Sequence, residues 1–221
     1  MLKRSHLSEK TCREIIQLFS EDLTATQIAG ITNVSRVTIN NYLKLIRTHI
    51  AKHCEEQVPG EFHRTRPEHV AQQPAHRASA SEDYNVYFGF YKENGNIFTE
   101  ELHAIDKSDI RALQQAVMLH SQQSTDTVDL VRYHAIADFD EWRLYRVDTA
   151  AANGKNYHDD IALFWGNTRN RLLKFRGLNK NTLYLHVKES EFRYNYRQDD
   201  INRLLLNIIY KYPLHLSKAY V

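Results

Sequence analysis

Residues 156–197 read NYHDDIALFWGNTRNRLLKFRGLNKNTLYLHVKESEFRYNYR, and this stretch decides the fold class of the C-terminal part of the chain. Aromatic and aliphatic residues recur in it at helical spacing, between many Arg and Lys residues. The pattern predicts one helix over about 159–176 and a second over 181–197. A third helix follows over 199–211, where apolar residues form a continuous stripe: Ile201, Leu204, Leu205, Ile208, Ile209 and Tyr212.

Strands are expected before these helices, so the C-terminal part belongs to the α/β class. The segment YNVYFGFY alternates as a β-strand does, and the Glu-Asn-Gly-Asn sequence that follows it fits a hairpin turn. The expected elements are strands at 84–91 and 97–104, a helix at 107–120, and short strands at 127–131 and 142–147.

The first fifty residues have a helical pattern of their own. Ser8 can cap a first helix, and Thr24 can cap a short second one. Asn33 lies where a sharp turn needs a residue that tolerates positive φ, and Ser35 can cap the next helix. Small Ala29 allows the second and third helices to approach closely. This is the layout of a helix-turn-helix, which places the first turns of its second helix in the major groove of DNA.

The outward side of the helix that Ser35 caps, the second helix of this motif, carries groups that suit DNA. Arg reads guanine edges, Asn reads adenine, and Lys and Thr suit phosphates. The alternative interpretation is a plain helical bundle with a polar exposed face. The candidate DNA-binding residues are Ser35, Arg36, Thr38, Asn40, Asn41 and Lys44.

The charge of the chain changes sign twice, although the net charge is only +2. Residues 1–53 carry +4, residues 54–152 carry −8, and residues 153–221 carry +6. The basic ends suggest two surfaces that face a polyanion, around an acidic middle that could hold cations. The alternative is ordinary solvated surface charge.

Three segments follow from these patterns. Residues 54–83 hold three of the four prolines and lack periodicity, which is typical of a linker. We therefore expect an all-α DNA-binding domain at 1–53, a linker at 54–83 and an α/β domain at 84–221. Cys12 and Cys54 form no CxxC pair, which excludes a zinc ribbon built from this motif.

The motifs of the C-terminal part resemble the end of a transposase of the ISXO-type group of bacterial insertion sequences. The order H-x-x-I-x-x-F-W, R-x-x-K-F-x-G and Y-L-H-x-K-E-x-E-F-R-Y-N carries the resemblance, which covers about 84–212 and is most specific within 156–197. It implies an RNase H-like domain behind the helix-turn-helix domain. Such an enzyme would bind terminal inverted repeats and target DNA as a homo-oligomer, and would cut and join strands with Mg²⁺ or Mn²⁺ held by acidic side chains.

The resemblance also indicates where the catalytic acids belong. The expected first acid is absent, because residues 60–62 (GEF) are followed by HRTR. The second is either Asp126 or Asp129, and these two are the expected metal ligands. The third position holds Ala162, which cannot bind a metal. Asp159 shares a helix face with it and is the remaining catalytic candidate, with helix capping as its alternative role.

The basic residues that follow Ala162 are expected to contact phosphates, because so many positive charges would otherwise repel one another. In part of the family the third catalytic position holds an amide side chain in place of an acid, and a lysine at the position of Lys174 complements it. The interleaved aromatic residues fit a core better than a base-stacking platform. The expected DNA contacts are Arg169, Arg171, Lys174 and Arg176, with Lys180, Lys188, Arg193 and Arg197 extending the basic surface.

Three functional hypotheses follow. The first is a transposase that performs metal-dependent cleavage and strand transfer. A variant of this hypothesis is that this copy has lost the activity. The second is a non-catalytic derivative that occupies repeats or represses. The third is a transcription factor with a ligand-sensing C-terminal domain. No apolar run is long enough for a signal peptide or a membrane span, so we expect a cytoplasmic, nucleoid-associated bacterial protein.

Overall fold

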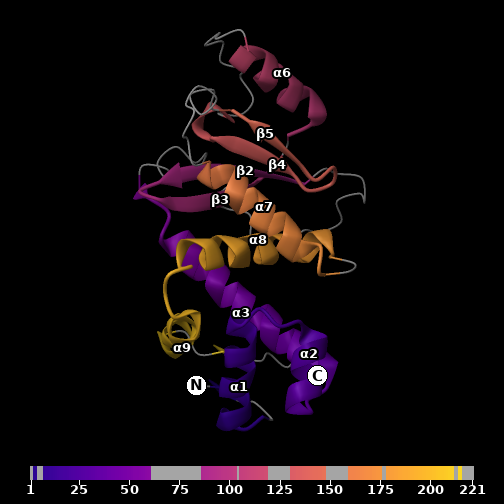
Figure 1. The fold of residues 1–221 in the computed structure, drawn as a ribbon, viewed down its shortest axis with the longest axis vertical. Helices are drawn as coiled ribbons and strands as arrows, with labels where there is room; N and C mark the ends of the chain where they lie inside the picture. Colours follow the sequence, from indigo (N-terminus) through magenta and orange to yellow (C-terminus); the bar gives the residue numbers. More distant parts are fainter. Residues whose placement is uncertain are drawn as a thin grey trace. The chain divides into compact units, whose positions relative to one another are not determined.

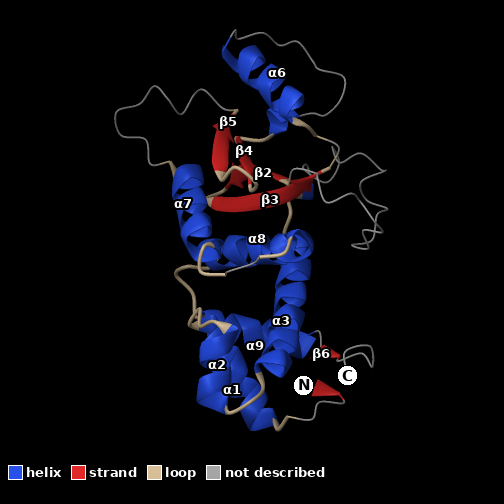
Figure 2. Cartoon of the chain, turned by 90° about the vertical axis from the view of Figure 1, so that its right-hand side faces the viewer, coloured by secondary structure: helices blue, strands red, loops and turns tan. Residues whose placement is uncertain are grey.

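The computed structural model is a mixed α/β structure, as predicted (Figures 1 and 2). No described helix combines the length and apolar character that crossing a bilayer demands. The residues that the structure describes are 2–3, 7–60, 86–103, 105–118, 130–147, 159–175, 178–211 and 214–215.

The chain forms two compact units. The helical unit consists of Met1–Gln57 together with Leu185–Val221, and the sheet unit consists of Val58–Tyr184. The sequence predicts that 185–221 belongs to the C-terminal domain, whereas in the structure this segment groups with the first helices. An amphipathic pattern shows that a helix face is buried, but it does not specify the partner of that face.

The described part of the helical unit contains four helices and most of a fifth. Two short strands, β1 and β6, also pair in parallel within it. In chain order its elements are β1 (Leu2–Lys3), α1 (Glu9–Ser20), α2 (Ala25–Thr32), α3 (Arg36–Glu56), the greater part of α8 (Lys180–Asn195), α9 (Ile201–Lys211) and β6 (Leu214–His215).

Local sequence signals set the starts of the first three helices. Ser8, Thr24 and Ser35 are their N-caps, and each accepts a hydrogen bond from the backbone N–H three residues further on. Gln27 completes a capping box on α2, because its Oε1 accepts from the Thr24 N–H at 2.9 Å. Asn33 ends α2 in the left-handed region, with φ 55° and ψ 24°. All four predicted roles are confirmed.

One hydrophobic core holds the helical unit together. Its members come from α1, α2, α3, α8 and α9, so segments distant in sequence share one interior. Ile39, Leu43 and Ile46 form the buried side of α3. The members of the predicted stripe that lie on α9 pack in this core, whereas Tyr212 lies outside the described residues. The fully buried members include Ile15, Phe19, Ile28, Ile39, Leu43, Ile46, Phe192, Leu205 and Ile209.

The sheet unit contains a four-stranded sheet in the order β3-β2-β4-β5, and each neighbouring pair is antiparallel. Its RNase H-like classification stays a prediction. In chain order the elements are β2 (Tyr87–Glu93), β3 (Asn96–Leu102), α6 (Lys107–Met118), a 3₁₀ turn (Leu130–Arg132), β4 (Ala135–Asp138), β5 (Arg143–Arg146), α7 (Asp160–Leu172) and the first turn of α8.

Alternation along β2 gives the sheet two different faces. Tyr87 points to one face, where it belongs to a cluster with Ile110 and Leu113 of α6. Phe90 points to the other face and contacts Phe164 and Trp165 of α7, with ring centroids 5.1 and 6.2 Å away. The sheet therefore lies between α6 and α7 (Figure 2).

The strands differ from the prediction in two places. The predicted strand at 127–131 is wrong over its described end, because Leu130–Arg132 forms a 3₁₀ turn. Strand β4 (Ala135–Asp138) was not predicted. All four of its residues are buried, and its alanines lie opposite Phe88 and Phe90 of β2, so it lacks the alternation of large apolar and polar residues that marks a half-exposed strand.

Candidate nucleic-acid interface and catalytic positions

The first half of α3 presents a polar arc. Arg36, Asn40 and Lys44 are exposed and follow one another at intervals of four, which places them along one side of the helix. Asn41 and Thr38 flank this line and are partly exposed. The predicted DNA-binding residues of α3 therefore share one accessible surface, and their contact with DNA stays a prediction.

Val37 is a member of this surface that the sequence reasoning missed. Its side chain is 71% exposed, on the second residue of α3. It lies one turn before Asn41, so it occupies the same arc as the polar candidates. An exposed apolar group there can contact the methyl group of thymine. Its position between Arg36 and Asn40 was the available signal, but an apolar side chain does not by itself indicate contact with DNA.

Ser35 has a structural role in this surface. Its Oγ accepts from the Thr38 backbone N–H at 3.2 Å and lies 2.8 Å from the Thr38 Oγ1. The first turn of α3 carries no acidic residue. Its N–H groups and Arg36 therefore make this helix end favourable for a phosphate.

A buried ionic network holds α3 against other helices of the same unit. Arg47 Nε donates to Glu189 Oε2 at 2.7 Å, and Arg193 Nε donates to Glu189 Oε1 at 2.9 Å. The Arg193 guanidinium also donates to the backbone carbonyls of Phe19 and Ser20 at the end of α1. The Glu189 side chain is fully buried. Arg193 is thus a structural link between α1 and α8, although the sequence suggested a phosphate contact.

A second buried pair lies beside this network. Lys188 Nζ donates to Glu191 Oε2 at 2.8 Å, and both side chains are buried. The Cys54 thiol donates to the Lys188 carbonyl at 3.7 Å, and burial raises the pKa of that thiol well above its ordinary value. The proposed phosphate contact of Lys188 is wrong, because its ammonium group is enclosed by the protein.

The candidate catalytic residue Asp159 caps α7. Its Oδ1 accepts from the Ala162 backbone N–H at 3.1 Å and from Arg146 NH1 at 2.9 Å. The adjacent Asp160 forms an ion pair with Lys92 of β2. The capping interpretation of Asp159 is confirmed, and its carboxylate is engaged in the structure. Ala162 is exposed on the first turn of α7.

The other catalytic candidates, Asp126 and Asp129, lie outside the described residues. Within the part of the chain that the structure describes, no three His, Cys, Asp or Glu side chains gather closely enough to hold a metal ion. The Mg²⁺ or Mn²⁺ site at these two aspartates stays a prediction.

The basic residues near the end of α7 divide into two kinds. Arg169 and Lys174 are exposed, as a phosphate contact requires. Arg171 is only 8% exposed, and its guanidinium lies 5.5 Å from the centroid of the Phe175 ring. Arg171 therefore packs within the sheet unit. Arg176 lies outside the described residues.

Comparison with known proteins found one similarity that bears on function. The chain is similar to an uncharacterized transposase-like protein of Haemophilus influenzae, with 33% identity over 69 residues. The match covers 30% of this chain and 56% of the relative, so the chain spans about half the length of the curated protein that it matches. No protein-family model matches the chain, and no solved structure matches it. The similarity supports a function related to transposition.

Proposed function

We propose that this chain is a DNA-binding protein of transposase lineage, in which α2, the turn at Asn33 and α3 form a helix-turn-helix that recognises terminal inverted repeats. The exposed line of Arg36, Asn40 and Lys44 on α3 carries this proposal. The left-handed Asn33 and the Ser35 cap support it, because they produce the sharp entry into the recognition helix. The transposase-like relative supports the lineage.

Some side chains of α3 suit DNA bases and others suit phosphates. Arg36 suits the O6 and N7 atoms of a guanine, and Asn40 and Asn41 suit an adenine. Lys44 and Thr38 suit phosphates, which fix the position of the helix on the duplex without reading its sequence. The basic charge of residues 1–53 and 153–221 favours association with a polyanion. Since the repeats occur in inverted pairs, we propose that two or more copies assemble on one element.

Binding to labelled repeat DNA tests this function, with a scrambled duplex as the reference. Asn40→Ala should cost roughly 1–3 kcal/mol on the repeat and should reduce the preference over the scrambled duplex. Lys44→Ala should weaken binding to both duplexes and should lower the slope of log affinity against log salt by about one.

Lys10→Ala is the matched control, because Lys10 is an exposed lysine of the helical unit that lies on α1. It should leave the preference for the repeat unchanged. Equal affinity of the unaltered protein for repeat and scrambled DNA would refute the proposed recognition.

We further propose that this copy binds repeats without cutting them. Ala162 stands where the resemblance expects an acid or an amide, and Asp159 holds the end of α7 and the Arg146 guanidinium. A two-metal mechanism needs several carboxylates around its ions. The second candidate is a competent transposase that uses Asp126 or Asp129 with Mg²⁺ or Mn²⁺.

Incubation of the protein with end-labelled repeat DNA and Mg²⁺ or Mn²⁺ distinguishes the non-catalytic protein from a competent transposase. Binding without strand cleavage is expected at all protein concentrations. Cleavage that disappears in Asp126→Ala or Asp129→Ala would establish the transposase and refute the non-catalytic form. Ala162→Asp tests whether a carboxylate at this position is enough to produce metal-dependent cleavage.

A further inference from the structure

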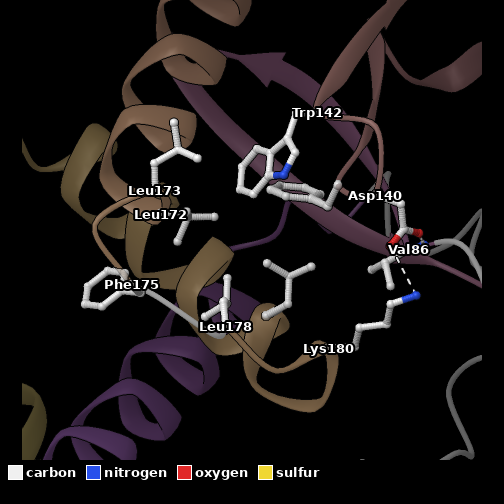
Figure 3. A pocket seen from close by; sticks show the side chains of 10 residues that line it. Val86, Asp140, Trp142, Leu172, Leu173, Phe175, Leu178 and Lys180 are labelled. Carbon is white, nitrogen blue, oxygen red and sulfur yellow. Dashed lines mark hydrogen bonds and ion pairs between the residues drawn. The ribbon is translucent and has the colours of Figure 1, made fainter. Parts of the chain in front are cut away.

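A half-open cavity of about 360 Å³ lies within the sheet unit (Figure 3). The turn after β4, the end of α7 and the start of α8 line it. Its size falls in the range of pockets that bind small molecules. The walls are mostly apolar and include three aromatic side chains, from Phe139, Trp142 and Phe175.

The turn between β4 and β5 holds Trp142 in an uncommon conformation. The backbone of Trp142 has φ 54°, in the left-handed region that bulky residues rarely adopt. Asp138 fixes the turn, because its Oδ1 accepts from the N–H groups of Asp140 and Glu141, both at 2.9 Å. Such backbone strain is concentrated at binding and catalytic sites.

The Trp142 indole rests on an aromatic cluster. Its ring centroid lies 5.6 Å from that of Phe139 and 6.2 Å from that of Trp165. Phe139 and Trp165 are buried, whereas Trp142 is only partly buried and lines the cavity. The cluster therefore presents the partly buried Trp142 ring to the cavity, with Phe139 lining the cavity beside it and Trp165 packed against both rings.

A fixed ion pair forms the polar part of the wall. Lys180 Nζ lies 3.1 Å from Asp140 Oδ1, and the other carboxylate oxygen of Asp140 accepts from the Val86 N–H at 2.9 Å. Both charged side chains are partly exposed. Figure 3 shows this pair on the opposite side of the cavity from Phe175. A donor and an acceptor thus stand side by side next to a flat apolar surface.

Positive charge lies at the end of α7 that contributes to the cavity. Lys174 is exposed and sits between the lining residues Leu173 and Phe175. Arg169 is exposed on α7, one turn before the lining residue Leu173. A ligand with a flat ring, a polar edge and an attached anion would be complementary to all three features.

We propose that this cavity receives one unpaired base of a DNA strand, stacked on Trp142 with its polar edge at Asp140 and Lys180. Phosphates of the same strand would contact Lys174 and Arg169. The proposal rests on the proposed DNA-binding function and adds a second, sequence-tolerant contact to the duplex recognition by α3. Aromatic side chains bind bases in this way because every base has a π-face, and a base that is already unpaired requires the least energy to enter.

Fluorescence of a single tryptophan tests the proposal. Trp142 and Trp165 are the two tryptophans of the chain, so Trp165→Phe leaves Trp142 as the reporter. A duplex repeat with one unpaired base should quench this fluorescence more than the fully paired repeat does. Trp142→Leu, made in the protein with its natural Trp165, should weaken binding of the unpaired-base duplex by roughly 5- to 150-fold. Trp142→Phe should retain part of that affinity.

Affinity for the fully paired repeat distinguishes the two proposals. Trp142→Leu should leave that affinity unchanged, because α3 belongs to the other compact unit, whereas Lys44→Ala should reduce affinity for both duplexes. Equal affinity of Trp142→Leu and the unaltered protein for the unpaired-base duplex would overturn the base-binding proposal alone. Failure to bind the paired repeat, with quenching by a single strand retained, would overturn the recognition proposed for α3 and leave the cavity as a base-binding site.

Discussion

Replacing Glu189 by Gln should lower the free energy of unfolding of the helical unit by about 3 kcal/mol. This residue is fully buried between two arginines, and its two carboxylate oxygens accept at 2.7 and 2.9 Å. The substitution keeps the size of the side chain and one acceptor oxygen, but it removes the negative charge. It leaves the Arg47 guanidinium largely enclosed without its counter-charge.

The magnitude follows from what each arginine retains. Loss of one partner of a buried ion pair costs roughly 3–5 kcal/mol. Arg193 still donates to the carbonyls of Phe19 and Ser20, so most of the cost comes from Arg47, and the lower end of the range applies. A loss of this size is a substantial part of a typical domain stability of about 5–15 kcal/mol.

The two cysteines provide an assay that is specific for the helical unit. Cys12 and Cys54 are buried thiols, they are the only cysteines of the chain, and both belong to this unit. Their reaction with a thiol reagent, measured against urea concentration, therefore reports the opening of the helical unit. Glu189→Gln should shift the midpoint to markedly lower urea.

Glu9→Gln is the control, because the Glu9–Arg13 pair lies on the surface of the same unit, with side chains 63% and 46% exposed. Exposed ion pairs contribute little, so its midpoint should not change measurably. Replacing Arg47 and Glu189 together by Met should recover part of the lost stability, because no unpaired charge then remains at Arg47. A Glu189→Gln protein as stable as the Glu9→Gln protein would refute the reasoning.

Three further predictions concern individual contacts. Gly89→Ala should lower the melting temperature and cost about 1–3 kcal/mol, because its Cβ would lie 2.4 Å from the Tyr133 ring; calorimetry checks this. Ser35→Ala should cost about 0.5–2 kcal/mol in urea unfolding, since the Thr38 N–H loses its partner. The Cys54 thiol has a raised folded pKa, so its contribution to stability is complete below the ordinary thiol pKa of 9.0 and is lost as pH rises above that value. Unfolding midpoints from pH 7 to 11 should therefore fall less in Cys54→Ala than in the unaltered protein.

The features that depend on neighbouring residues were predictable from the sequence. Ser8, Thr24 and Ser35 cap helices, and Asn33 adopts positive φ, because each role requires only the residue itself and the backbone next to it. Periodicity likewise located α9, because a stripe of apolar residues is visible without knowledge of the partner.

The features that depend on distant partners were not predictable. Lys188 and Arg193 read as surface cations in a basic stretch, but Glu189 and Glu191 within the same helix neutralise them inside the protein. Strand β4 was missed because it is buried on both faces and uses small residues. The cavity beside Trp142 depends on a turn, a helix end and a helix start that only the folded chain brings together.

The division of the helical unit between the two ends of the chain affects the order of folding during synthesis. Met1–Gln57 leaves the ribosome first, but the part of its core contributed by α8 and α9 is made only after the whole of Val58–Tyr184. At about 5–20 residues per second, this delay lasts roughly 6–25 s. During that interval the apolar sides of α1 and α3 lack their final cover, so the nascent chain presents a binding surface for chaperones well before the core of the helical unit is complete.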